Sequence, residues 1–268
     1  MNKSLTDSYT DSPFHKANNF RIIPLSEGSF TIDKTKIFIP FNHDEHDLQH
    51  RPIGSLLVEV QPFCIITNQD IILIDTGLGF SSKNQLQIHA NLLANGIEPN
   101  QVTQVLMSHL HKDHAGGVSK KDNFGNYQLA FPNATYYVQH KEFEFAMETG
   151  FPVFMTEEIG VLEDSIQVEW LDGDGIIDGI EDVKVEYEVT GGHSPFHQVF
   201  RIELGGQILF FGGDDAPQLQ QMKSKFVAKY DFDGKKCMEL RQQWWQEGQE
   251  NNWTFLFYHD IKAPVHSF

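Results

Sequence analysis

Residues 108–117 read Ser-His-Leu-His-Lys-Asp-His-Ala-Gly-Gly, and this stretch says most about the fold and the chemistry of the chain. The pattern His-x-His-x-Asp-His would arise by chance in roughly 2 of 1,000 chains of this composition, which argues against a polar loop with incidental histidines. His109 and His111 stand two apart at a predicted strand end, so both imidazoles point to one side. Asp113 and His114 can face a second point close by. One tetrahedral zinc cannot easily use so many neighbouring ligands, so the motif favours two metals roughly 3.5–4 Å apart.

Further metal-ligand side chains stand directly after other apolar runs. These residues are Asp75, His193, Asp214 and His259. Two glycines precede His193 and allow the backbone to come close to a metal. Polar residues just beyond apolar strands are placed where clefts form at one edge of a sheet. We therefore expect these side chains to join the 108–117 motif in one site.

Composition excludes several classes of protein. The chain has 268 residues, 20 Lys plus Arg against 37 Asp plus Glu, a formal charge of -17, 13 His and two Cys. The acidic balance argues against nucleic acid or an anionic membrane as partner, since both need a basic face. Cys64 and Cys237 allow at most one disulfide, which excludes a disulfide scaffold and a structural cysteine zinc site. The first residues contain no apolar signal segment and no run approaches the ~20 residues that span a bilayer, so we expect a cytoplasmic protein.

The hydrophobic pattern predicts two groups of strands, each accompanied by helices. Strands are predicted at residues 20–25, 29–32, 35–39, 55–60, 63–67, 71–75, 104–108, 135–139, 165–171, 183–189, 199–204, 207–211 and 254–258. Helices are predicted at 83–95, 141–148 and 238–247. This order indicates two packed sheets with helices outside, in a single domain over residues 16–268 that follows a flexible segment at 1–15.

With these motifs in order, the chain resembles the metallo-β-lactamase fold superfamily, a broad family of metal-dependent hydrolases. The resemblance covers roughly residues 20–262. The resemblance is strongest to the branch of N-acyl homoserine lactonases and methyl parathion hydrolase. Two stretches carry this resemblance, Gly-Ser-Phe-Thr-Ile-Asp at 28–33 and Gly-Ile-Glu-Pro at 96–99. It implies a mixed α/β fold, an αβ/βα four-layer sandwich, with the site along the edge between the sheets.

The resemblance also implies a role for each motif residue. One metal would be held by His109, His111 and His193, the other by Asp113, His114 and His259, with Asp214 as the bridge between them. Asp75 would orient a ligand histidine rather than bind metal, because such partners fix the tautomer and the ring angle. His197, four residues after His193, is expected to support the site from behind or to pack against a strand.

These residues predict a binuclear hydrolase with zinc as the expected metal and manganese, cobalt or iron as alternatives. A hydroxide shared by two metals would attack a lactone, ester or similar small, neutral acyl substrate, and Asp113 would pass a proton to the leaving group. A phosphoester or phosphotriester hydrolase and an iron-dependent sulfur dioxygenase are the alternatives for the same site. No Gly-x-Ser-x-Gly elbow is present, so a serine nucleophile is not expected. A homodimer is compatible with the sequence.

Two positions depart from the lactonase pattern. Pro217 stands three residues after Asp214, where that branch has a tyrosine that contacts the substrate carbonyl. The sequence Asp-Lys-Thr at 33–35 replaces the usual Asp-Gly-Gly of the N-terminal hairpin. Either Tyr230 or Tyr258 could take over the role of the missing tyrosine.

Overall fold

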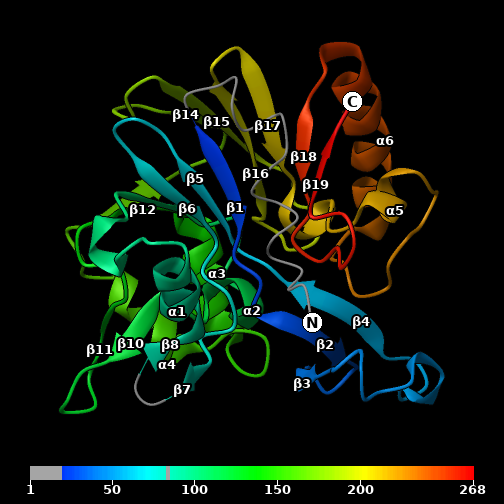
Figure 1. Ribbon diagram of the computed structural model, residues 1–268, viewed down its shortest axis with the longest axis horizontal. Coiled ribbons are helices and arrows are strands. Elements are labelled where there is room, and N and C mark those ends of the chain that lie inside the picture. Colours follow the sequence, from blue (N-terminus) through cyan, green and yellow to red (C-terminus); the bar gives the residue numbers. More distant parts are fainter. Residues whose placement is uncertain (1–19, 83–84) are drawn as a thin grey trace, which may run out of the picture.

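Two six-stranded sheets face one another in the computed structural model, which describes residues 20–82 and 85–268 (Figure 1). The first sheet contains, in spatial order, β1 (Arg21–Pro24), β5 (Phe63–Ile66), β6 (Ile71–Ile74), β9 (Gln104–Leu106), β12 (Thr135–Gln139) and β13 (Val168–Leu171). The second contains β14 (Gly175–Ile177), β15 (Val183–Val189), β16 (Gln198–Leu204), β17 (Gln207–Phe211), β18 (Thr254–Leu256) and β19 (Val265–Ser267).

The space between the sheets is filled by alternate residues of their strands. In β6, Ile72 and Ile74 pack in the cluster that holds Phe200 and Ile202 of the second sheet, whereas Leu73 packs on the opposite face. Successive side chains of a strand point to opposite faces, so a run that is apolar throughout is buried on both sides. This explains why the central strands read as continuous apolar stretches in the sequence.

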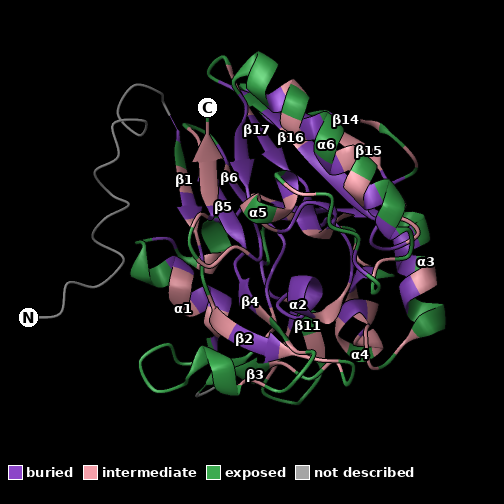
Figure 2. Ribbon diagram, turned by 90° about the vertical axis from the view of Figure 1, so that its right-hand side faces the viewer, coloured by how far each residue is buried: buried purple, intermediate pink, exposed green. Residues whose placement is uncertain are grey.

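Helices cover the outer face of each sheet. Ile88 of α1 (Gln87–Ala94) and Phe143 of α3 (His140–Thr149) pack in the cluster on the outer side of the first sheet. Trp244 of α6 (Gly234–Asn251) packs against Phe210 on the outer side of the second. Figure 2 shows the strands mostly buried and α6 with its exposed residues facing outward. The predicted four-layer αβ/βα sandwich is therefore confirmed.

Strand direction gathers the loops that carry the predicted site. β6, β9 and β12 run parallel, so their carboxyl ends meet at one edge of the first sheet. β15, β17 and β18 run in a common direction in the second sheet, because β17 and β18 are parallel and two antiparallel pairings separate β15 from β17. Two short elements follow these strands at the site, α2 (Lys112–Ala115) and the 3₁₀ turn η6 (Gly213–Asp215).

A third, three-stranded sheet lies at the same end of the molecule, close to α2 in Figure 1. Its strands, in spatial order, are β3 (Ile39–Pro40), β2 (Gly28–Ile32) and β4 (Leu56–Val60). The remaining elements are the ladders β7 (Ser81–Ser82) with β8 (Gln85–Leu86) and β10 (Ser119–Lys121) with β11 (Tyr127–Leu129), the helices α4 (Thr156–Ile159) and α5 (Leu219–Met222), and the 3₁₀ turns η3 (Leu48–His50), η4 (Pro99–Gln101) and η5 (Gly160–Leu162).

The structure corrects several predicted elements. The strand predicted at 35–39 is wrong except at its end, because Lys36 adopts a left-handed conformation (φ 59°) that interrupts an extended chain. The helix predicted from residue 83 begins at Gln87, and β19 is an edge strand that the pattern did not indicate.

Cys64 and Cys237 are both free and buried. The flexible segment predicted at 1–15 lies outside the described residues, within which no helix combines the length and the apolar character that a bilayer span requires.

Candidate metal centre

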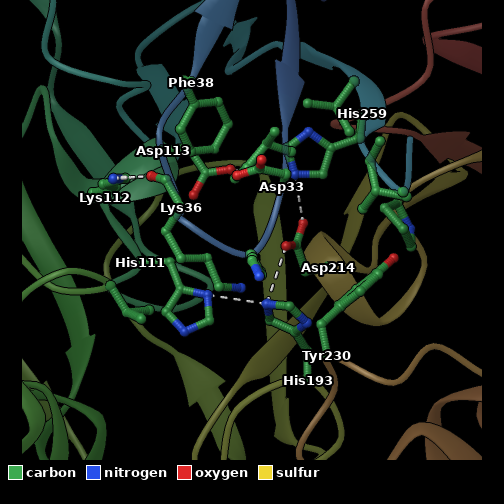
Figure 3. Close-up of a pocket in the computed structure, with 17 residues that line it drawn as sticks. Asp33, Lys36, Phe38, His111, Lys112, Asp113, His193, Asp214, Tyr230 and His259 are labelled. Atoms are coloured by element: carbon green, nitrogen blue, oxygen red, sulfur yellow. Dashed lines mark hydrogen bonds and ion pairs between the residues drawn. The ribbon is translucent and has the colours of Figure 1, made fainter. Parts of the chain in front are cut away.

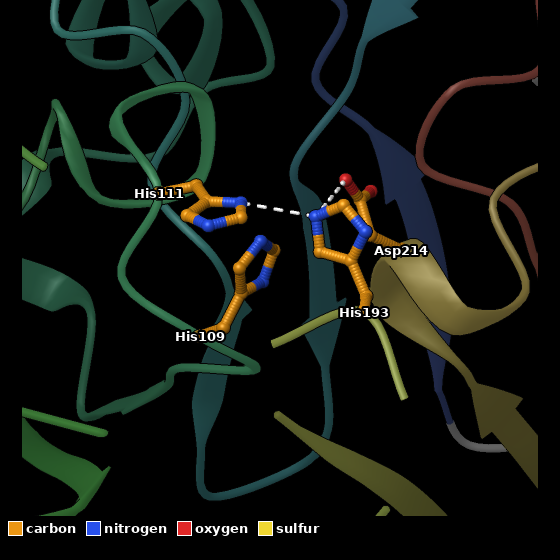
Figure 4. A group of neighbouring side chains, drawn as sticks. All are labelled: His109, His111, His193 and Asp214. Carbon is orange, nitrogen blue, oxygen red and sulfur yellow. Dashed lines mark hydrogen bonds and ion pairs between the residues drawn. The ribbon is translucent and has the colours of Figure 1, made fainter. Parts of the chain in front are cut away.

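The seven predicted ligands come from loops that follow strands of both sheets. Four belong to the segment after β9 and three to the loops after β15, β17 and β18. The structure brings them together as two groups, in each of which one ligand atom per residue lies within 4.8 Å of the others. The first group, drawn in Figure 4, is His109, His111, His193 and Asp214, and the second is Asp113, His114 and His259.

In the first group, ring nitrogens face one another across a short gap. His193 Nε2 lies 3.0 Å from His111 Nδ1 and 3.1 Å from Asp214 Oδ2. Burial lowers the pKa of His111 well below its usual value, and the charge of His193 adds to this effect. Burial lowers the pKa of His109 in the same way. Both histidines are therefore neutral near pH 7, which is the form that binds a cation.

Asp214 connects the two groups. Its Oδ2 faces His193, whereas its Oδ1 lies 2.9 Å from His259 Nε2 and 3.1 Å from His114 Nε2. Burial raises the pKa of Asp214, but His259, His114 and His193 outweigh burial and keep that pKa well below its usual range. The carboxylate is therefore ionised and offers one oxygen to each group.

The second group packs against a buried tyrosine. Asp113 Oδ2 lies 3.5 Å from His259 Nε2 and 3.8 Å from His114 Nε2. The His114 ring stacks on Tyr258, with ring centroids 4.0 Å apart, and the Tyr258 hydroxyl donates to the backbone carbonyl of Asp113 at 2.6 Å. Tyr258 is fully buried. Its hydroxyl is thus occupied within the protein, and it cannot stand in for the missing lactonase tyrosine.

Four of the histidines have their Nδ1 atoms held by partners outside the two groups. With the distance to Nδ1, these are Ser108 Oγ for His109 (3.0 Å), Asp75 Oδ2 for His114 (2.7 Å), Asp231 Oδ1 for His193 (2.8 Å) and the Glu59 carbonyl oxygen for His259 (2.6 Å). A partner that accepts from Nδ1–H fixes the tautomer with its lone pair on Nε2. The Nε2 atoms are thereby left for the interior of the site.

These inward atoms fit divalent cations. His109 Nε2, His114 Nε2 and Asp214 Oδ1 are buried, and none makes a hydrogen bond of regular geometry to any described residue, although Asp214 Oδ1 lies within ion-pair distance of His114 and His259. Leaving a buried polar atom without a partner costs about 1–3 kcal/mol, so these atoms, which come from both groups, favour a bound cation in each group. All seven donors are imidazole nitrogens or carboxylate oxygens, a set that suits zinc, manganese, cobalt and iron.

Asp75 fixes the position of the motif segment. It follows β6 at a positive φ of 56° and is fully buried. Its Oδ1 accepts the Ser108 N–H at 2.8 Å, and its Oδ2 lies 2.7 Å from both Ser108 Oγ and His114 Nδ1. One carboxylate thus orients His114 and anchors the backbone just before His109.

Replacing Asp75 with asparagine should weaken metal binding roughly ten- to a hundredfold, as loss of a carboxylate behind a ligand histidine does. The amide offers one acceptor oxygen where three donors converge, so His114 loses its fixed orientation. Competition with a chromophoric chelator measures the affinity. Asp122→Asn is the matched control, because that aspartate caps the exposed turn between β10 and β11. Equal affinities in the two variants would contradict this role of Asp75.

His197 and Asp215 support the loop of Asp214. His197 Nε2 accepts the Asp214 N–H at 3.1 Å, and its Nδ1 lies 3.1 Å from Asp215 Oδ2. Asp215 Oδ1 also accepts the backbone N–H of His193 at 2.6 Å. A Cβ atom on Gly192 would lie 2.4 Å from that oxygen, so the close approach requires glycine. The structure therefore places His197 behind the site rather than among the ligands.

Besides Asp215, two further supporting carboxylates were not predicted from the sequence. Asp231 lies beside His193 Nδ1, and Glu142 of α3, only 1% exposed, accepts from the Leu110 N–H (3.2 Å) and from Ser194 Oγ (2.8 Å). Glu142 thus connects the loop of the 108–117 motif with the loop that carries His193. In the sequence, Glu142 looks like one more acidic residue on a polar helix, and no spacing relates Asp231 to a predicted ligand. Neither role could therefore be predicted from the sequence.

A cavity of about 500 Å³ opens over both groups (Figure 3). Its apolar walls come from Ile32, Phe38, Leu56, Val58 and Val153. Pro217 and Tyr230 also line it, with the Tyr230 ring centroid 6.1 Å from that of His193. Burial raises the pKa of Tyr230, so its hydroxyl stays protonated and can donate. Of the two candidate tyrosines, Tyr230 is the one that reaches the cavity.

The chain is similar to known proteins in sequence and in fold. A family model, the metallo-beta-lactamase superfamily, matches residues 59–218, which is more than half of the chain. The N-acyl homoserine lactonase AttM of Azorhizobium caulinodans is 31% identical over 123 residues, or 43% of this chain and 41% of that protein. The chain thus spans about two fifths of the length of the curated relative it matches.

Solved structures match over nearly the whole chain. Hydrolase AbOPH, of the beta lactamase superfamily, aligns with a TM-score of 0.70 and 23% identity over 94% of this chain and 91% of its own. AidC, a dizinc quorum-quenching lactonase solved with the product N-hexnoyl-L-homoserine, aligns with a TM-score of 0.70 and 16% identity over 93% of this chain and 90% of its own. At these identities the two structures show a shared fold.

Proposed function

The chain belongs to the metallo-beta-lactamase superfamily, and from that membership we propose that it is a metal-dependent hydrolase of a lactone, ester or similar small acyl compound. The observation that carries the proposal is the linkage of two ligand groups by Asp214 beneath a cavity of about 500 Å³. A cavity of this volume suits a small molecule rather than a polymer. The relative AttM, an N-acyl homoserine lactonase, supports an acyl substrate.

We propose one divalent cation in each group, with zinc as the first choice. The residues that would hold the cations are His109, His111 and His193 on one side, Asp113, His114 and His259 on the other, and Asp214 between them. When bound, such cations supply Lewis acidity, which activates water near neutral pH and stabilises negative charge on an acyl oxygen. AidC, which shares the fold, is a dizinc enzyme.

The chain's own groups supply the remaining steps. Asp113 lines the cavity, and among the described residues its carboxylate makes no hydrogen bond, so it is free to take a proton from water and deliver it to the leaving group. Tyr230 can donate a hydrogen bond to the acyl oxygen, since its hydroxyl stays protonated. The apolar walls bind the hydrocarbon part of the substrate and exclude water from it.

Metal removal provides the direct test. The purified protein should contain about two metal equivalents, and dialysis against a strong chelator should remove nearly all turnover of a γ-lactone or aryl ester. Adding zinc back should restore the turnover. Elemental analysis and rate measurements on the same samples check both expectations, and full activity at less than one tenth of a metal equivalent would refute the proposal.

A substrate panel separates acyl hydrolysis from its alternatives. A lactone, a thioester, an aryl ester and an aryl phosphotriester should be assayed in parallel with the zinc-loaded protein. Preferential cleavage of the phosphotriester would indicate that the protein hydrolyses phosphoesters rather than acyl compounds. Oxygen consumption with a persulfide by an iron-loaded sample would indicate a sulfur dioxygenase instead.

A further inference from the structure

The loop between β2 and β3 forms one wall of the cavity. Asp33, Lys34, Lys36 and Phe38 of this loop all line it. In Figure 3, the side chain of Lys36 points from the loop into the cavity, toward the space between His111 and Asp214.

The backbone around Lys36 is fixed on both sides of the residue. Its N–H donates to the Asp33 carbonyl at 3.0 Å, and its own carbonyl accepts from Lys112 Nζ. Lys112 also lies over the Phe38 ring, 5.7 Å from the centroid. Lys112 immediately precedes Asp113, so the loop is tied to α2 beside the second ligand group. The backbone position from which the Lys36 side chain projects is therefore held by the fold.

The ammonium of Lys36 lacks a counter-ion within the described ranges. No carboxylate among the residues in 20–82 and 85–268 forms an ion pair with it. Asp33, the acid in the same loop, is instead bound by the Thr35 N–H at 2.9 Å and the Thr35 hydroxyl at 2.6 Å. Lys36 is only partly exposed, and its charge contributes to the lowered pKa of His111. A partly buried ammonium that faces a ligand cavity without a partner is suited to pair with an anion.

The charges that line the cavity favour an anion as well. Its lining includes three lysines, Lys34, Lys36 and Lys112, but only Asp33 as an acid besides the two proposed ligands Asp113 and Asp214. Cations bound in the two groups would offset those ligand carboxylates. With both cations bound, the cavity would be positive, although the chain as a whole carries a formal charge of -17.

We propose that the substrate carries a single negative charge, a carboxylate, and that Lys36 binds this group. The inference rests on the proposed hydrolase function and names its substrate class: a small acyl compound with an apolar part and a carboxylate. Phe38, Leu56 and Val58 face the apolar part, and one free ammonium balances one negative charge. This anionic substrate is an alternative to the neutral one that is expected from the sequence.

Matched substrate pairs test the proposal by turnover. The mono-4-nitrophenyl ester of glutaric acid carries a free carboxylate, and its methyl ester differs in lacking that charge. The wild-type kcat/KM should favour the anion about ten- to a hundredfold, the worth of a charge-assisted hydrogen bond. Lys36→Met should remove most of this preference and Lys36→Arg should restore it. Lys34→Met, which removes an exposed charge from the same loop, should change the ratio far less. An unchanged ratio in Lys36→Met, or an equal loss in Lys34→Met, would overturn the assignment.

A binding measurement keeps the inference separate from the proposed function. Hexanoate and hexanamide, equal in length, can be titrated calorimetrically into the zinc-loaded protein and into Lys36→Met. Bound zinc also attracts carboxylate, so the decisive quantity is the hexanoate-to-hexanamide affinity ratio, which should fall about tenfold in the variant. If this ratio falls while neither ester is cleaved, the hydrolase proposal fails and the anion site stands. If the esters are cleaved but neither the kcat/KM ratio nor the affinity ratio changes in Lys36→Met, the anion site alone fails.

Discussion

Replacing Asp214 with asparagine is expected to lower kcat/KM by roughly three orders of magnitude and to reduce the bound metal below two equivalents. Asp214 is the residue whose two carboxylate oxygens face different ligand groups. Asparagine keeps the shape but provides one acceptor oxygen, and its NH₂ group would face the ring nitrogens of one group. Elemental analysis and steady-state rates measured on one preparation check the two effects together.

The control for this variant is Asp44→Asn, which removes the same charge from an exposed loop. It should retain wild-type rates and metal content. The bridging role of Asp214 would be contradicted if Asp214→Asn kept two metal equivalents and more than a tenth of the activity.

Asp113→Asn is expected to lower kcat by about two to four orders of magnitude and to leave the fold intact, because a positioned acid–base group contributes this much. The side chain forms no hydrogen bond to the rest of the described chain, and the carbonyl that accepts from Tyr258 belongs to the backbone. The melting temperature of the metal-free protein should therefore equal that of the wild type. The variant should lose at most the metal of the second group, whereas the Asp214 variant affects both groups.

Turnover near that of the wild type in Asp113→Asn would remove the proton-transfer role. A large fall in melting temperature would indicate instead that the residue is structural. Single-turnover rates separate the chemical step from product release, so they show which step has slowed.

The layers of the fold and the location of the site could be predicted from local patterns. Apolar runs such as 71–74 mark strands buried on both faces, and polar ligand residues stand directly after these runs. The spacing of the 108–117 motif placed four side chains in one short segment. The three distant predicted ligands stand directly after apolar runs, where clefts form at one edge of a sheet, and the resemblance implied how the seven divide into two groups.

Features that depend on contacts between distant segments could not be predicted. Lys36 adopts a left-handed conformation, and its carbonyl oxygen accepts a hydrogen bond from Lys112, which lies far along the chain. Tyr230 and Tyr258 looked equivalent in the sequence, but in the structure Tyr258 packs against His114 whereas Tyr230 lines the cavity. Glu142 was indistinguishable from a surface acid, because its burial depends on where α3 meets the two ligand loops.

The division of the proposed ligands between the two sheets has a mechanical consequence. Four of the seven follow a strand of the first sheet and three follow strands of the second, so a cation bound in either group would cross-link the two halves of the sandwich. Separating the sheets would then require breaking metal–ligand bonds as well as exposing apolar surface. Metal would in this way act on the rate of unfolding, and the occupancy of the centre would govern the lifetime of the folded chain as well as its chemistry.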